Sequence, residues 1–183
     1  MLQHGELVDP EATFTVALVE HVTTGTWLGN GDPTPGFGPD FQPLKDGELG
    51  PYLQHLTWLR ADILPFIHDL TPEQIVVIPD SGGWSIYRIL EHVAESERVY
   101  LRMTVGKVDG LSATLRSIQP DPEVLSSALV NLWQIISSRL IAMTGVEREQ
   151  KVPHGQVTWT ARRGLRRMLE HNWEHLVQLS GLL

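Results

Sequence analysis

The residues with the clearest capacity for chemistry are two histidines near the end of the chain, His171 and His175. They stand four residues apart, so in a helix both imidazoles lie on one side, where they resemble half of a metal site. A third histidine, His92, ends the run Ile89–His92, and the chain nearly repeats this run as Met168–His171. Together these histidines predict a three-histidine site for a divalent metal.

Three neutral imidazoles leave a metal at least one open position for water or for a substrate atom. There the metal can lower the pKa of water toward about 7, or hold a thiol as a thiolate. Either route produces a nucleophile without a serine or cysteine from the protein. The chain has no cysteine, which excludes disulfides, thiolate ligands and a cysteine nucleophile, so any thiol must come with a cosubstrate.

A carboxylate beside the metal could orient water or act as a base. Glu95 is the nearest candidate, because it lies about 60° around the helix from His92, and its alternative role is that of a solvated surface residue. Glu91 and Glu174 stand next to predicted ligands but point about 100° away from them. We expect them either to hold the histidines in place or to lie on the surface.

Apolar residues recur with a period near 3.6 in four stretches, which predicts four amphipathic helices. They cover about residues 52–70, 85–104, 122–144 and 160–181. Ser85 and Thr160 are expected to cap their helices, whereas Gly145 should end the third helix and Pro65 should kink the first. Four such helices predict an all-α main domain folded as a four-helix bundle.

The order of the helices decides whether the histidines can meet. Each helical residue advances about 1.5 Å, so His92 lies about 10 Å from the start of its helix and His175 about 9 Å from the end of the last helix. These levels agree only if the two helices are antiparallel. The connections before and after the third helix, about seventeen and fifteen residues long, can each cross the bundle. An up-down-down-up order is therefore permitted and would make the two helices antiparallel.

The first part of the chain has a different pattern. Residues 13–28 are rich in β-branched residues and predict a short β-hairpin, whereas repeated glycine and proline over residues 29–51 predict a loop or linker. We expect residues 1–48 to form an N-terminal appendage of hairpin and linker, and residues 49–183 to form the bundle. Because a lone hairpin is marginally stable and has unpaired edges, it should pack on the bundle or on a second subunit, and we expect a homodimer.

Charge and composition limit the partners. The 183 residues, 42% of them hydrophobic, suffice for one sizeable core, and the net charge of −8 argues against nucleic acid as the main partner. Arg162, Arg163, Arg166 and Arg167 form the one basic cluster, which we interpret as a solvated helix face. No leader pattern and no apolar run near the length of a membrane span are evident, so we expect a cytoplasmic protein with a small-molecule substrate.

Two histidines four residues apart also occur by chance, and an inward histidine is often a hydrogen-bonded core residue. An alternative to an enzyme is therefore a non-catalytic binding or stress-response protein in which a metal braces the bundle. The other five histidines share no spacing and are interpreted as surface or loop residues: His4, His21, His55, His68 and His154.

The pattern resembles the DinB-like superfamily, which includes YfiT-type metal-dependent hydrolases and bacterial thiol S-transferases. The resemblance covers about residues 50–183 and has four parts. These are Gly82-Gly83-Trp84-Ser85 before the second helix, Leu90-Glu91-His92 within it, Trp159-Thr160 before the last helix, and His171 with His175.

This resemblance implies a four-helix bundle of up-down-down-up order, in which one histidine of the second helix and two of the last bind a divalent metal, often zinc or nickel. It thus assigns His92, His171 and His175 as metal ligands. It also implies either hydrolysis or thiol S-transfer with a low-molecular-weight thiol as cosubstrate, without choosing between these activities.

Overall fold

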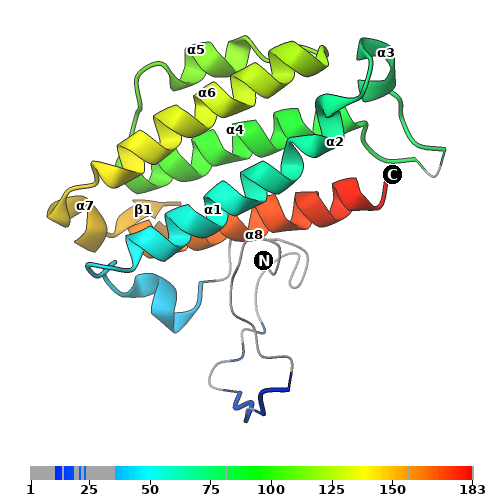
Figure 1. Cartoon of the computed structure of the whole chain (residues 1–183). Coiled ribbons are helices and arrows are strands. Elements are labelled where there is room, and N and C mark those ends of the chain that lie inside the picture. Colours follow the sequence, from blue (N-terminus) through cyan, green and yellow to red (C-terminus); the bar gives the residue numbers. More distant parts are fainter. Residues whose placement is uncertain are drawn as a thin grey trace.

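The computed structural model describes residues 11–13, 15–18, 21, 23, 36–80, 82–155 and 157–182. Its main part is a bundle of four long helices (Figure 1). These are α1 (Leu49–Ile63), α4 (Ile86–Val105), α6 (Pro122–Ile141) and α8 (Ala161–Ser180). In Figure 1, α1 and α8 run in one direction and α4 and α6 in the other, which is the up-down-down-up order.

The two helices that carry the histidines begin where the sequence predicts. The Ser85 hydroxyl oxygen accepts a hydrogen bond from the Arg88 amide at 3.3 Å and caps α4. The Thr160 hydroxyl oxygen likewise accepts from the Arg163 amide at 3.1 Å and caps α8. These caps satisfy amide groups that have no partner inside the helix. Because each cap fixes where its helix begins, it also fixes how far along the helix the histidines lie.

The other two long helices end earlier than predicted. The first stops at Ile63, because Pro65 begins a separate short helix, α2 (Pro65–His68). The third stops at Ile141, and Gly145 starts the short helix α7 (Gly145–Glu149) instead of ending α6. The Thr144 side chain caps α7 in a capping box, a start signal that the glycine had obscured. Two further short helices lie in the connections, α3 (Pro72–Ile75) and α5 (Leu111–Arg116).

The small sheet is near the C-terminal helix and not at the N-terminus. Its strands β1 (Val152–His154) and β2 (Val157–Trp159) are antiparallel, with Val152 opposite Trp159, in a stretch that was predicted to be a loop. The hairpin predicted over residues 13–28 falls largely outside the described residues, and those described there form no strand. Strands of three residues are too short to show an alternating pattern, which explains why the sequence did not reveal the sheet.

The glycine- and proline-rich segment before α1 packs on the bundle where the structure describes it. It includes a short 3₁₀ helix, η2 (Gly38–Phe41), that contacts α8. Asp40 and Leu44 in this segment are buried, at 2% and 3% exposure. α1 begins at Leu49, the first residue of the predicted bundle, and whether residues 1–48 form a unit of their own stays a prediction.

α8 packs most extensively against α4 and then against α1. The α4–α8 contact is close because Gly164 has no side chain. A Cβ built at Gly164 would clash with the hydroxyl oxygen of Thr104. The Thr104 hydroxyl donates a hydrogen bond to the Tyr100 carbonyl at 2.7 Å, so it cannot turn away without losing that bond. This close approach brings the histidines of the two helices together.

We expect Gly164→Ala to lower the free energy of unfolding by about 1–3 kcal/mol, because the added methyl group overpacks the α4–α8 contact. The measurement is urea unfolding followed by circular dichroism. Gly50→Ala in α1 is a matched control, since no atom lies within 4 Å of its Cβ position. That control should stabilise the protein by up to about 1 kcal/mol through helix propensity alone.

Adding Thr104→Ala to Gly164→Ala should recover part of the lost stability, because it removes the nearest atom that the new methyl group meets. If Gly164→Ala stabilised the protein as Gly50→Ala does, α4 and α8 would be farther apart than the structure has them.

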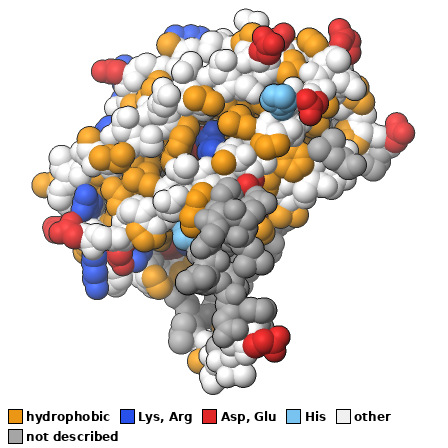
Figure 2. Space-filling view, viewed as in Figure 1, with side chains coloured by type: hydrophobic (Ala, Val, Ile, Leu, Met, Phe, Trp, Pro, Cys, Tyr) orange, Lys and Arg blue, Asp and Glu red, His pale blue; other side chains and the backbone are white. Residues whose placement is uncertain are grey.

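The apolar character of α6 was underestimated. Its most apolar window has a mean hydropathy of 1.3, so by length and composition α6 could cross a membrane. Its polar residues are scattered along the helix, so the sequence contains no unbroken apolar run of that length. In the bundle, Leu125, Leu132, Ile136 and Leu140 are fully buried, and 33% of the apolar window lies inside the protein. Figure 2 shows hydrophobic side chains gathered on the face over α1 and α6, where a hollow of about 180 Å³ is lined by residues of α1, α4 and α6.

Candidate functional site

The three predicted histidines come together between α4 and α8. One ring nitrogen of each of His92, His171 and His175 lies within 4.8 Å of the others. The Nε2 atoms of His92 and His171 are 3.1 Å apart, and the ring centroids of His171 and His175 are 4.5 Å apart. All three side chains are at least partly buried. The antiparallel arrangement of the two helices therefore places the histidines at one level, as the sequence required.

Two acceptors on α8 hold the outer nitrogens of its histidines. His175 Nδ1 lies 2.8 Å from Gln178 Oε1, and His171 Nδ1 lies 3.4 Å from Glu174 Oε2. An amide or carboxylate oxygen at Nδ1 favours the tautomer with its proton on Nδ1, which leaves the lone pair on Nε2. The Nε2 atom of His171 points toward His92. This pairing of a ligand nitrogen with an outer acceptor is what metal sites use to orient histidines.

The donor set fits a divalent metal. Nitrogen atoms bound to one tetrahedral zinc ion lie about 3.3 Å apart, given zinc–nitrogen distances of about 2.0–2.1 Å. His92 and His171 already match this spacing, at 3.1 Å. The ligand nitrogens of all three histidines lie within 4.8 Å of one another. A small rotation of one side chain would bring the remaining nitrogen to the spacing that zinc requires. Imidazole ligands suit zinc, nickel, copper and iron, so the residues do not choose among these metals.

The protein environment disfavours protonation of His92 and His171. Burial lowers the pKa of His171 to about 3, and positive charge on His175, His92 and Arg167 lowers it as well. Burial also lowers the pKa of His92, with contributions from His175 and Arg88. A metal ligand must have a free lone pair, so a histidine that resists protonation is ready to bind near neutral pH.

The lowered pKa of His171 predicts a pH dependence of stability in metal-free protein. The unfolded chain binds a proton near the ordinary value of 6.5, whereas the folded chain binds it only near 3. Because the unfolded state binds more protons in that window, the free energy of unfolding must fall as the pH drops from 6.5 toward 3.

Urea unfolding in the presence of a chelator, at about pH 7 and about pH 4.5, measures this effect. His171→Gln, which cannot titrate there, should lose less stability over the same interval than the native protein. Carboxylates contribute equally to both proteins, so an identical loss in both would contradict the lowered pKa.

The structure places three further side chains at the site, those of Trp84, Ser96 and Tyr100. Trp84, next to the cap of α4, has its ring centroid 4.9 Å from that of His92 and stacks near His175 at 6.4 Å. Ser96 Oγ lies 3.0 Å from His171 Nε2. The Tyr100 ring lies 5.9 Å from the His171 ring. Ser96 and Tyr100 follow His92 at intervals of four, so helical spacing was the signal that could have found them.

The predicted carboxylates have different environments. Glu174 lies beside His171, where it can hold that histidine in place, which is one of the two roles expected for it. Glu91 instead bonds to Arg88 and to the Tyr87 hydroxyl. Glu95 has a half-exposed side chain that accepts a hydrogen bond from Arg98 at 2.9 Å. Its role as a base stays a prediction, and it would require this ion pair to open.

The remaining histidines do not join the site where the structure describes them. His68 is exposed and bonds to Asp69, and His154 is exposed on β1. His55 is partly buried in α1, where its Nδ1 lies 2.8 Å from the Pro51 carbonyl oxygen. His55 lines a groove of about 380 Å³ between α1 and α8. Leu169 and Trp173 of α8 line the same groove and lie on a different side of that helix from His171 and His175. His4 is outside the described residues.

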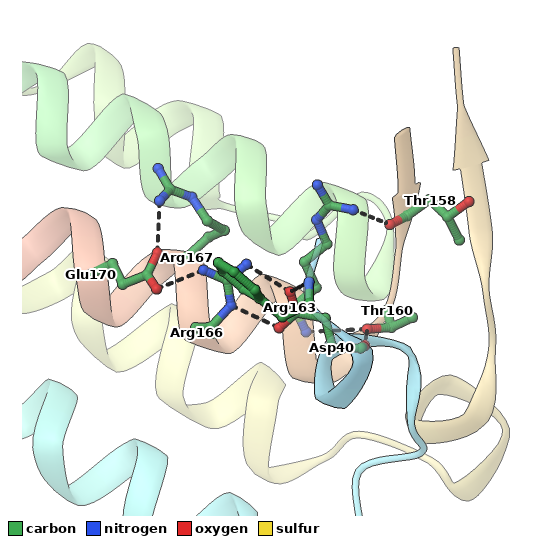
Figure 3. A network of polar contacts seen from close by, with 8 residues as sticks. Asp40, Thr158, Thr160, Arg163, Arg166, Arg167 and Glu170 are labelled. Atoms are coloured by element: carbon green, nitrogen blue, oxygen red, sulfur yellow. Dashed lines mark hydrogen bonds and ion pairs between the residues drawn. The ribbon is translucent and has the colours of Figure 1, made fainter. Parts of the chain in front are cut away.

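The basic cluster at the start of α8 is not a solvated face. Arg163 and Arg167 are buried, at 1% and 4% exposure. Figure 3 shows Arg166 bound by both carboxylate oxygens of Asp40, at 2.7 Å each, and Glu170 bridging Arg166 and Arg167 at 2.6 and 2.7 Å. The segment before α1 supplies Asp40, which helical periodicity could not reveal. The network ties this segment to α8 and places Arg167 one turn before His171.

Comparisons with known proteins agree with this fold. A family model described as the DinB superfamily matches residues 55–179, more than half of the chain. Among curated proteins, none matches the chain in sequence.

A similar solved structure is that of YfiT from Bacillus subtilis, described as a probable metal-dependent hydrolase with an unusual four-helix bundle topology. It is 18% identical in sequence, with a TM-score of 0.59, and the match covers 76% of this chain and 87% of YfiT. At this identity the likeness shows a shared fold.

Proposed function

Because the chain belongs to the DinB superfamily and its bundle gathers three imidazoles, we propose that it binds a divalent metal and acts as a metal-dependent hydrolase. His92, His171 and His175 would hold the metal. The observation that carries this proposal is the group of three ligand nitrogens within 4.8 Å of one another. The description of YfiT as a probable metal-dependent hydrolase supports the same class of reaction.

When bound, the metal would lower the pKa of a water molecule at its open position toward about 7. The residues of the chain would prepare the site for that chemistry. Gln178 and Glu174 orient His175 and His171 through their Nδ1 atoms. Trp84 covers His92 and His175 with an apolar ring, which limits the access of bulk water. We propose zinc or nickel as the metal, since imidazole ligands suit both.

Thiol S-transfer is the second candidate, because the same open position suits a thiolate. Since the chain has no cysteine, a low-molecular-weight thiol would have to be a cosubstrate. The third possibility is a metal that braces the bundle without turnover.

The test loads metal-free protein with zinc, nickel or cobalt and measures hydrolysis of ester, amide and phosphoester reporter compounds, with and without a thiol. Metal-dependent turnover that is lost in His92→Ala, His171→Ala and His175→Ala and kept in His68→Ala supports an enzyme. His68 is the matched control because it is an exposed histidine at the end of another helix. Turnover only with the thiol would select S-transfer. Bound metal without turnover on any compound would favour the bracing role.

A small-molecule substrate, a homodimer and a cytoplasmic location remain predictions from the sequence. Size-exclusion chromatography with light scattering measures the mass in solution and decides between a monomer and a dimer.

A further inference from the structure

Ser96 lies at the metal-binding edge of the site. It follows His92 by four residues on α4, so both side chains are on the same side of the helix. Its hydroxyl lies 3.0 Å from His171 Nε2 and can donate a hydrogen bond to that nitrogen. His171 Nδ1 faces Glu174, so Nε2 is the atom that would bind the metal. Once a metal takes that lone pair, the Ser96 hydroxyl can no longer donate to that nitrogen and becomes available to another acceptor beside the metal.

The charge of a bound metal favours an anion as that acceptor. Three neutral ligands would leave the full charge of the metal uncompensated. The charged side chains nearby are already paired with one another, because Glu91 binds Arg88 and Glu170 binds Arg167. Glu174 lies on the outer side of His171. The positive charge at the open position would therefore come from the metal.

We propose that the Ser96 hydroxyl donates a hydrogen bond to an anionic group of the substrate or inhibitor that occupies the open position of the metal. Ser96 would thus determine affinity for small anions and not affinity for the metal. This inference rests on the proposed metal site. Hydrogen bonds to a charged acceptor are among the stronger ones in proteins, so the effect should be large enough to measure.

The experiment uses the full chain loaded with cobalt(II), whose visible spectrum reports its ligands, and titrates it with azide. Ser96→Ala should weaken azide binding about tenfold or more, as loss of a hydrogen bond to a charged group predicts. Ser96→Thr keeps the hydroxyl and should bind azide within about threefold of native protein. Cobalt affinity, measured by competition with a chelating dye, should not weaken in Ser96→Ala, because that serine would donate to the ligand nitrogen only when the metal is absent.

Gln178→Ala is the contrasting variant. It removes the acceptor at His175 Nδ1, and loss of such a partner lowers metal affinity by about 10- to 100-fold. Unchanged azide affinity in Ser96→Ala overturns the inference. A parallel loss of cobalt affinity in Ser96→Ala also overturns it, because Ser96 would then be a metal ligand. If native protein bound no cobalt, the proposed metal site itself would fail, so the two failures are distinguishable.

Discussion

Replacement of His171 by alanine is expected to remove metal binding. Native protein purified without a tag should contain about one divalent metal per chain by mass spectrometry, and His171→Ala should contain close to none. Only two of the three gathered imidazoles would remain, and His171 is the one whose Nε2 lies beside both His92 and Ser96. His92→Ala should behave in the same way, because its nitrogen comes from the opposite helix.

Thermal stability supplies an independent measurement of the same prediction. A ligand that binds only the folded state at 100 times its Kd stabilises that state by about 2.7 kcal/mol. Added metal should therefore raise the Tm of native protein and of the control His68→Ala, and leave the Tm of His171→Ala unchanged. Metal retained at native levels in His171→Ala would remove this histidine from the ligand set. Native protein that takes up no metal after metals are added back would refute the three-histidine site.

The second large effect is expected at Glu97, a buried carboxylate beneath the site. Its side chain is fully buried and forms an ion pair with Arg60, whose side chain is 8% exposed. It also accepts a hydrogen bond from the buried Asn172 amide at 2.9 Å. Glu97→Ala would leave both partners buried without this acceptor. We expect the free energy of unfolding to fall by about 3–5 kcal/mol, as is typical when one member of a buried ion pair is removed.

Urea unfolding measures this loss, and Glu95→Ala is the matched control. Glu95 is two residues away on the same helix, but its side chain is half-exposed and pairs with Arg98 at the surface. Removing an exposed pair should change stability by about 0.5 kcal/mol or less. Should Glu97→Ala fail to fold, Glu97→Gln retains an acceptor for Asn172 and tests the charge alone. Equal effects for Glu97→Ala and Glu95→Ala would mean that the Arg60–Glu97 pair does not hold the bundle together.

The same two glutamates show the limit of the sequence. Glu95 and Glu97 have equal local propensities, and Glu95 was the predicted candidate for chemistry. The structure places Glu97 in the interior because α1 brings Arg60 and α8 brings Asn172 to meet it. These two partners come from distant parts of the chain, and no pattern within α4 indicates them.

What the sequence determined by itself is local. Helical periodicity, the caps Ser85 and Thr160 and the four-residue spacing of His171 and His175 depend on interactions within a few residues. The three candidate ligands were therefore identified, and their common level followed from the length of each helix. The N-terminal hairpin was a local inference that falls largely outside the described residues, and those described there form no strand. The sheet before α8 was too short to be recognised from the sequence.

Tertiary structure decided how the helices meet. It brought His92 to α8 through the close contact of Gly164 with Thr104, added Ser96 and Trp84 to the site, and buried Arg163 behind the segment that contains Asp40. Each outcome depends on which helix surfaces pack against each other and exclude water, and that is decided by the packing of the whole bundle. The sequence could propose the ligands for a metal, whereas only the packed helices decided which side chains surround them.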